Sequence, residues 1–217
     1  MRKYVIAGVQ GSGKGTQAKM LQEDFNLVHI SVGDIFRWNI QNHTRLGARI
    51  KRIVAAGELV PDEIVTEQMK IRLEQHDWNF GFVLDGFPRS LAQAEFFLEN
   101  YDVDALIQIE VPDAVVFERI LARRICSGCG LDYNLIFHRP ARIDACDVCR
   151  GSLVIREDDT PEAIRGRLDD YHSKTKPVID LFRRKERVVV ADGTRPALEV
   201  QRQSRAQLGL PETVSAA

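Results

Sequence analysis

The sequence predicts an α/β fold, a three-layer sandwich in which one parallel sheet of five strands lies between two layers of helices. Three observations predict it. Five short apolar runs have the length of buried strands, segments of helical periodicity separate them, and a single interval breaks this alternation. The chain has 217 residues, which is enough for one good-sized core and a small insertion. Ligands of such a sheet bind at the carboxyl ends of its strands.

The first half of the chain supplies three strands. Residues 3–7 form an apolar run that stops at glycine-rich sequence, and from Lys14 apolar residues return at helical spacing. A short strand is predicted over 28–30, followed by three modest helices between residues 34 and 75, with Gly57 and Pro61 between them. Residues 80–84 have the pattern of a buried strand that ends at Asp85.

The second half supplies the other two strands and the interval that breaks the alternation. Residues 106–111 predict a strand, and Pro112 and Asp113 open a helix expected to run to about Arg124. A long helix is predicted from about Pro161, and residues 188–191 form the last strand. We therefore expect a core domain of residues 1–124 and 160–217, and an inserted subdomain of residues 125–159.

Composition excludes several classes of protein. The 30 basic and 31 acidic residues give a formal net charge of −1, which argues against general binding to nucleic acid or to anionic membranes. Apolar runs stay well short of the ~18 residues of a membrane span, and the N-terminus lacks the pattern of a signal peptide. We expect a cytoplasmic monomer that binds neither nucleic acid nor membrane.

All four cysteines lie in the inserted segment. Cys126 and Cys129 form one Cys-x2-Cys pair, and Cys146 and Cys149 form a second pair sixteen residues later, which is the spacing of a zinc ribbon. Four thiolates would make a closed structural site for an insert of ~35 residues, which is too small for a core of its own. Two local disulfides and four free thiols are the alternatives. His138 is expected to be exposed and not to be a ligand.

Residues 8–16 read Gly-Val-Gln-Gly-Ser-Gly-Lys-Gly-Thr between the first strand and the first helix. Successive backbone N–H groups and the helix N-terminus can surround phosphate oxygens there, and Lys14 would reach the transferring phosphates. The general phosphate-loop pattern has Ser or Thr directly after the Lys, whereas here Gly15 precedes Thr16. The alternative is an ordinary tight turn between strand and helix.

Two further segments follow strands and so reach the same sheet edge. Arg37 comes after the second strand and Arg89 after the third, and guanidinium groups grip phosphate oxygens bidentately. Asp85 ends its strand where a carboxylate suits the water shell of Mg²⁺, with a helix cap as the alternative.

More arginines flank the insert. Arg119 and Arg123 are expected four apart on one helix face, Arg156 precedes two aspartates, and Arg167 lies on the next helix. Closure of the insert would carry these cations onto the reacting phosphates.

Together these motifs resemble the adenylate kinase and nucleoside monophosphate kinase family, in its bacterial long-lid form with a four-cysteine metal site. The resemblance rests on the phosphate loop with Gly-Thr-Gln after Lys14, on Asp-Gly-Phe-Pro-Arg at 85–89, on Val-Pro-Asp at 111–113 and on the arginines around the insert. It covers residues 1 to about 208. Gln10 stands where the family usually has Pro, a departure expected to affect loop rigidity more than phosphate contact.

The resemblance implies a reversible, direct in-line transfer of phosphoryl from Mg–ATP to AMP, giving two ADP, with Mg²⁺ and a structural Zn²⁺ as cofactors. It implies an acceptor-binding segment at about residues 31–60 and a closing lid at residues 125–159. The implied catalytic residues are Lys14, Arg89, Arg123, Arg156 and Arg167, with Asp85 near Mg²⁺. ATP would contact Gly11, Ser12, Gly13, Lys14, Gly15, Thr16, Arg119, Arg123, Asp132, Tyr133 and Arg195. AMP would contact Val32, Arg37, Glu58, Leu59, Val60, Gly86, Phe87, Pro88, Arg89, Gln93, Arg156 and Arg167.

Three other functions are weighed against this one. Gln93 occupies the position where adenylate kinases read the adenine edge, but Val32 replaces their usual Thr, so a UMP/CMP kinase is an alternative. A zinc-ribbon nucleic-acid adaptor with a nucleotide switch is a second alternative. A regulatory GTPase is disfavoured, because the sequence has no Asn-Lys-x-Asp element for reading guanine.

Overall fold

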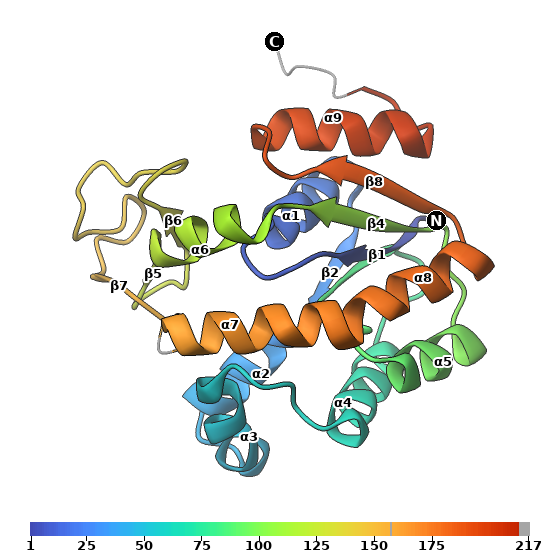
Figure 1. Cartoon of the computed structure of the whole chain (residues 1–217), viewed down its shortest axis with the longest axis horizontal. Coiled ribbons are helices and arrows are strands. Elements are labelled where there is room, and N and C mark those ends of the chain that lie inside the picture. The colour runs from blue at the N-terminus through green and yellow to red at the C-terminus, as the bar shows by residue number, and fades with distance from the viewer. Residues whose placement is uncertain (157, 213–217) are drawn as a thin grey trace.

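A computed structural model describes residues 1–156 and 158–212; residue 157 of the expected insert and residues 213–217 of the expected core lie outside the described residues. Its main sheet has the strand order β2-β3-β1-β4-β8, and every neighbouring pair is parallel (Figure 1). The strands are β1 (Lys3–Ala7), β2 (Val28–Ser31), β3 (Phe82–Asp85), β4 (Ala105–Glu110) and β8 (Val188–Asp192). The predicted α/β class with a five-stranded parallel sheet is confirmed.

Helices bury both faces of this sheet, because side chains along each strand point alternately to opposite sides. Tyr4 and Ile6 of β1 pack toward α1 (Lys14–Phe25) and α9 (Ala197–Leu208). Val5, between them, packs into the cluster formed with α5 (Leu91–Asn100) and α8 (Lys176–Lys185). In Figure 1, α9 accordingly lies above the sheet and α8 below it.

Three helices between β2 and β3 extend the second of these clusters, as predicted. They are α2 (Val32–Gln41), α3 (Arg45–Ala56) and α4 (Asp62–Glu74), and Figure 1 shows them below α7 and α8. Ser31 caps α2 by accepting a hydrogen bond from the Asp34 N–H, and Thr44 caps α3 in the same way from Gly47. This group of helices borders the carboxyl end of β2.

One predicted helix ends earlier than expected. Helix α6 (Asp113–Leu121) stops before Arg123, which instead begins strand β5 (Arg123–Cys126). The backbone of Arg123 pairs with Asn134 of β6 (Asp132–Asn134), and the Leu135 N–H donates to the Ala122 carbonyl at 2.9 Å. Long-range strand pairing therefore overrides local helix propensity, and the expectation that Arg119 and Arg123 share one helix face is wrong.

Two other elements differ in detail from the sequence prediction. Strand β3 begins at Phe82 rather than at residue 80, because the Phe80 N–H closes a turn onto the Asp77 carbonyl at 3.0 Å. The long helix predicted from Pro161 is present as α7 (Pro161–Asp170), a π-helical turn (Tyr171–Thr175) and α8. Within the described residues, no helix combines the length and the apolar character needed to cross a membrane.

The insert forms a small sheet of its own at one end of the molecule (Figure 1). Its strand order is β6-β5-β7, with β7 at Leu153–Val154, and both pairings are antiparallel. Among the described residues, its buried cluster comprises Cys126, Tyr133 and Cys146, with Leu131 and Leu153 packed against it. So small an apolar cluster supplies little folding free energy.

The outer edge of β8 is bonded to side chains of α9. Gln203 Oε1 accepts from the Asp192 N–H at 3.0 Å, and Gln207 Oε1 accepts from the Val190 N–H at 3.2 Å. Gln207 Nε2 also donates to the Val190 carbonyl at 2.5 Å. These two glutamines form hydrogen bonds with backbone groups of β8 that would otherwise be free to pair with a sixth strand.

Candidate active site

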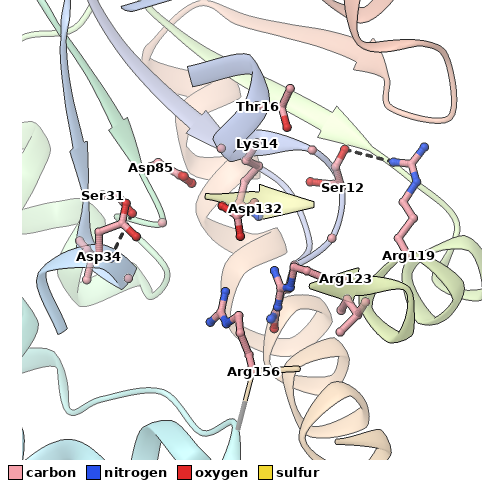
Figure 2. Close-up of a pocket in the computed structure, with 18 of the residues that line it drawn as sticks. Ser12, Lys14, Thr16, Ser31, Asp34, Asp85, Arg119, Arg123, Asp132 and Arg156 are labelled. Carbon is pink, nitrogen blue, oxygen red and sulfur yellow. Dashed lines mark hydrogen bonds between the residues drawn. The ribbon is translucent and has the colours of Figure 1, made fainter. Parts of the chain in front are cut away.

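A cavity of about 740 Å³ lies at the carboxyl ends of the strands, between the main sheet, helices α2 to α4 and the insert. Residues 10–16 of the phosphate loop line it, and so do Arg37, Arg89, Arg119, Arg123, Arg156, Arg167 and Arg195. Figure 2 shows Lys14, Asp85, Arg123 and Arg156 around one open space. The fold therefore brings together side chains from the two ends of the chain, such as Gln10 and Arg195.

The phosphate loop owes its shape to glycine. Gly13 precedes α1 with φ 98°, a left-handed conformation that favours glycine, and no side chain caps the helix. At Gly8, an added Cβ would lie 2.5 Å from the Ile109 carbonyl oxygen, so only glycine fits between β1 and β4. The uncapped first turn of α1 leaves its N–H groups directed at the cavity, where an anion would satisfy them.

Lys14 curls over this loop. Its Nζ donates to the Val9 carbonyl at 2.8 Å. Burial lowers the pKa of Lys14 to about 8, with Arg89 and Arg123 adding to the effect and Asp85 opposing it. An anion bound in the loop would favour the ammonium form and reverse this shift.

Asp85 faces the N-terminus of α1 from the end of β3. A Cβ added at Gly15 would lie 3.6 Å from its Oδ2, and His29 Nε2 lies 3.6 Å from the same oxygen. Burial would raise the pKa of Asp85, but His29, Lys14 and Arg89 outweigh it and hold this pKa below its usual value. The group is therefore a carboxylate at neutral pH, as a partner for Mg²⁺-bound water requires.

Two adjacent aspartates, Asp158 and Asp159, hold three of the arginines. Arg156 forms a bidentate pair with Asp158, at 2.9 Å from Nε and 2.6 Å from the terminal nitrogen, and Arg167 bonds the same carboxylate. Arg123 pairs with Asp159 in the same bidentate manner. Burial would raise the pKa of Asp158, but Arg156 and Arg167 keep it well below its usual range. The arginines are thus held at the cavity wall by Asp158 and Asp159.

One half of the cavity lies next to helices α2, α3 and α4. It has an apolar wall and contains two arginines. Val32, Glu58, Leu59 and Val60 line it together with Gly57. Arg37 pairs with Asp34, and Arg89 Nε donates to the Gly86 carbonyl at 2.9 Å. An apolar slot with cations at one end suits a planar base joined to a phosphate.

Two residues of the predicted acceptor set do not line this cavity. Phe87 is 1% exposed and packs edge-on against Phe97, and Pro88 follows it through a cis peptide bond. Both border a separate small cavity of about 70 Å³ beneath the loop. Their side chains therefore support the turn that carries Arg89, and their contact with AMP stays a prediction.

Sequence reasoning missed Phe137 in the insert. Its ring lies 4.9 Å from the Arg119 guanidinium carbon, it lines the cavity, and it is 64% exposed. An exposed aromatic ring stacked on an arginine at a cavity mouth is a surface on which a base can pack. The signal was available, because Phe137 ends a short apolar run, Leu-Ile-Phe at 135–137, in an otherwise polar part of the insert.

Asp132, Tyr133 and Arg195 also line the cavity, as expected, but Tyr133 makes contacts on its other side too. Its hydroxyl lies 3.4 Å from Cys146 Sγ and accepts from the Asp147 N–H at 2.8 Å. His138 is exposed, as predicted, and its ring stacks on Tyr133 at 5.2 Å. Tyr133 therefore connects the cavity wall to the cysteine cluster.

The four cysteines converge on one point. Their Sγ atoms all lie within 4.8 Å of one another, and the pairs Cys126–Cys149 and Cys129–Cys146 are 3.3 and 3.6 Å apart, so none forms a disulfide. Cys126 Sγ also accepts N–H bonds from Gly128 and Cys129. A Cβ at Gly151 would approach Cys126 Sγ to 2.9 Å, so the backbone closes tightly around the sulfurs. This donor set could hold a metal and fits tetrahedral Zn²⁺, whose ~2.3 Å bonds place thiolates just under 4 Å apart.

Comparison with known proteins adds independent evidence. The family model described as "Adenylate kinase" matches residues 6–187. The adenylate kinase of Caldicellulosiruptor bescii is 43% identical over 213 residues, which cover 96% of this chain and 99% of that protein. The adenylate kinase of Lachnoclostridium phytofermentans is 44% identical over 203 residues (90% or more of each chain). That of Clostridium perfringens is 42% identical over 204 residues, also over more than 90% of each chain.

Proposed function

Because the chain belongs to the adenylate kinase family, as its motifs predict, we propose that it transfers a phosphoryl group reversibly from Mg–ATP to AMP, giving two ADP. An oxygen of the AMP phosphate would form a bond to the γ-phosphorus as the bond to the β–γ bridging oxygen breaks, and ADP would leave. One observation carries the proposal above all. A phosphate loop and a pair of arginines, Arg37 and Arg89, border the same cavity, with five further arginines around it.

The donor half would be built from the phosphate loop and the insert. The N–H groups of residues 11–16 and the Lys14 ammonium would bind the β- and γ-phosphates. Ser12 Oγ is buried without a hydrogen-bond partner among the described residues, which suits a phosphate oxygen. Arg119, Phe137 and Arg195 would border the adenosine, with Asp132 and Tyr133 closing the site.

The acceptor half would use the apolar slot. Arg37 and Arg89 would bind the AMP phosphate, and Val32 and residues 58–60 would surround the base and sugar, with Gln93 at its edge. Gly86 also lines the acceptor half of the cavity. Phe87 and Pro88 belong to the supporting turn.

Positioning and charge neutralisation would supply the catalysis. Arg123, Arg156 and Arg167 would face the transferring group, and Asp85 would orient water on the Mg²⁺ that accompanies ATP. No general base is required for a phosphate nucleophile. We divide the chain into a core of residues 1–124 and 160–217, an acceptor segment at about 31–60 and a lid at 125–159, whose closure would exclude water. The four cysteines would hold a structural Zn²⁺ in that lid.

Initial rates with Mg–ATP and AMP, CMP, UMP or GMP test this proposal. We expect AMP to be the preferred acceptor. Preference for UMP or CMP would favour the alternative of a UMP/CMP kinase, which rests on Val32 in place of the usual Thr. Absence of transfer to any of the four, combined with salt-dependent binding to nucleic acid, would favour the adaptor. The cytoplasmic location and the monomeric state stay predictions.

A further inference from the structure

The side-chain amide of Gln93 is held from two sides. Its Nε2 donates to Asp62 Oδ1 at 2.6 Å, and its Oε1 accepts from the backbone N–H of Arg89 at 2.9 Å. Gln93 is 2% exposed and borders the acceptor half of the cavity, as Val32 and Val60 also do. A buried amide with two fixed partners presents one defined pattern of donor and acceptor to the cavity.

These partners determine which way round the amide stands. The Asp62 carboxylate only accepts hydrogen bonds, and the backbone N–H of Arg89 only donates. Turning the Gln93 amide over would place its Oε1 against the Asp62 carboxylate and its Nε2–H against the Arg89 N–H. Both contacts would then be repulsive. Asp62 is itself fixed, since Ser90 Oγ donates to its Oδ2 at 2.8 Å.

The free positions of the amide can be counted. A glutamine amide has two N–H donors and two acceptor lone pairs, and the contacts to Asp62 and Arg89 use one of each. One N–H and one lone pair therefore remain, in a fixed order. A 6-aminopurine presents the complement, an amino N–H beside the N1 acceptor. A 6-oxopurine presents the reverse, an oxygen beside N1–H, and would need the amide turned over.

We propose that Asp62 is a positioning residue that makes the acceptor site select 6-aminopurine nucleotides over 6-oxopurine nucleotides. It does so by holding the Gln93 amide in one orientation. This inference rests on the proposed function, since it concerns the acceptor of that reaction. Asp62 contacts Gln93 and Ser90 and does not line the cavity, so its effect on the base is exerted through Gln93.

Steady-state kinetics with AMP and with IMP, which differ only at the 6-position and N1, test the inference in four proteins. Asp62→Ala removes the acceptor that holds the Nε2 side of the Gln93 amide. Asp62→Asn removes the charge but keeps an oxygen for Gln93 and gives Ser90 Oγ an N–H donor. Glu63→Ala is the matched control, because Glu63 is the other acidic residue in the first turn of α4 and is exposed.

We expect Asp62→Ala to lower the AMP-to-IMP ratio of kcat/KM by about tenfold, the range of one hydrogen bond. Asp62→Asn and Glu63→Ala are expected to keep this ratio within about threefold of the wild-type value. An unchanged ratio in Asp62→Ala overturns the inference. A loss in Asp62→Asn as large as in Asp62→Ala also overturns it, because charge rather than amide orientation would then be responsible.

Thermal melting establishes that each variant is folded, and Asp62→Leu, which keeps the branch at Cγ but has no hydrogen-bond acceptor, replaces Asp62→Ala if the latter does not fold. A merely structural role of Asp62 would change rates with both acceptors alike and leave the ratio unchanged. Failure of the unaltered protein to phosphorylate AMP would contradict the proposed function instead, so the two failures are distinguishable.

Discussion

Arg123 Nε donates to Asp159 Oδ2 at 2.8 Å, and the carboxylate that it meets has a side-chain exposure of 0%. The same carboxylate lies 3.8 Å from Arg167 and accepts from Gln10 Nε2 at 3.4 Å. Asp159 thus joins the first residue of strand β5, a helix of the core and the phosphate loop. A buried ion pair of this kind fixes geometry at a cost in desolvation.

We expect Asp159→Ala to lower the free energy of unfolding by about 3 kcal/mol, because it leaves the largely buried Arg123 without its carboxylate. It should also lower kcat/KM at least tenfold, since Arg123 loses its fixed position. Denaturant unfolding and steady-state kinetics measure the two effects. Glu74→Ala is the control, because its pair with Lys70 is 4.0 Å long and exposed, and it should change stability by less than about 0.5 kcal/mol. Equal effects of the two substitutions would contradict the role given to Asp159.

Nucleotide binding should take up a proton through Lys14 at alkaline pH. The pKa of Lys14 in the free protein is lowered to about 8 by burial, and bound phosphate would raise it. The bound state then holds more protons, so affinity is fully present below pH 8 and falls as pH rises toward the bound-state pKa. Calorimetry at about pH 8.5 in buffers of different ionisation enthalpy measures the uptake. Lys14→Arg, which stays protonated, should abolish it; equal uptake by both proteins would assign the proton to another group.

We expect Arg89→Lys to raise KM for AMP by about tenfold or more. Arg89 uses its Nε for the Gly86 carbonyl and keeps its terminal nitrogens for a bidentate contact, whereas a lysine has one nitrogen for both tasks. Steady-state kinetics with varied AMP measure the change. Arg52→Lys, on the exposed face of α3, is the control and should have no effect. Unchanged kinetics in Arg89→Lys would remove Arg89 from the acceptor site.

Cys129→Ser should remove the metal and loosen the lid while leaving the phosphate loop intact. The buried cluster of the insert is too small to replace a metal, so we expect the melting temperature to fall by roughly 5 °C or more. Elemental analysis and melting with and without a chelator test this. Ser127→Ala, in the same Cys-x2-Cys turn, should retain both metal and stability. If the melting temperature of the unaltered protein is the same with and without the chelator, the cysteines do not hold a structural metal.

The sequence predicted the sheet and the ends of its strands well, because buried parallel strands are continuous apolar runs. It also placed most of the cavity residues, since a phosphate loop and strand-end arginines have strong local patterns. It placed Arg123 on the wrong element, because the pairing of Arg123 with Asn134 is invisible to helical periodicity.

Contacts between distant side chains were beyond sequence reasoning for the same reason. The replacement of the usual Pro by Gln10 was interpreted as a change in loop rigidity, whereas the structure gives its amide a partner 149 residues away, at Asp159. The family resemblance implied that Phe87 contacts AMP, and only the structure shows that its ring packs on Phe97 in the core.

The glutamines that bond to β8 have a consequence for behaviour at high concentration. A second copy of the chain could extend the sheet at β8 only by displacing Gln203 and Gln207 from three hydrogen bonds. Helix α9 therefore protects the β8 edge from pairing with another molecule, which would lead to edge-to-edge aggregation. Replacing both glutamines would free these backbone groups of β8, at the edge of the sheet opposite β2, to pair with other copies of the chain.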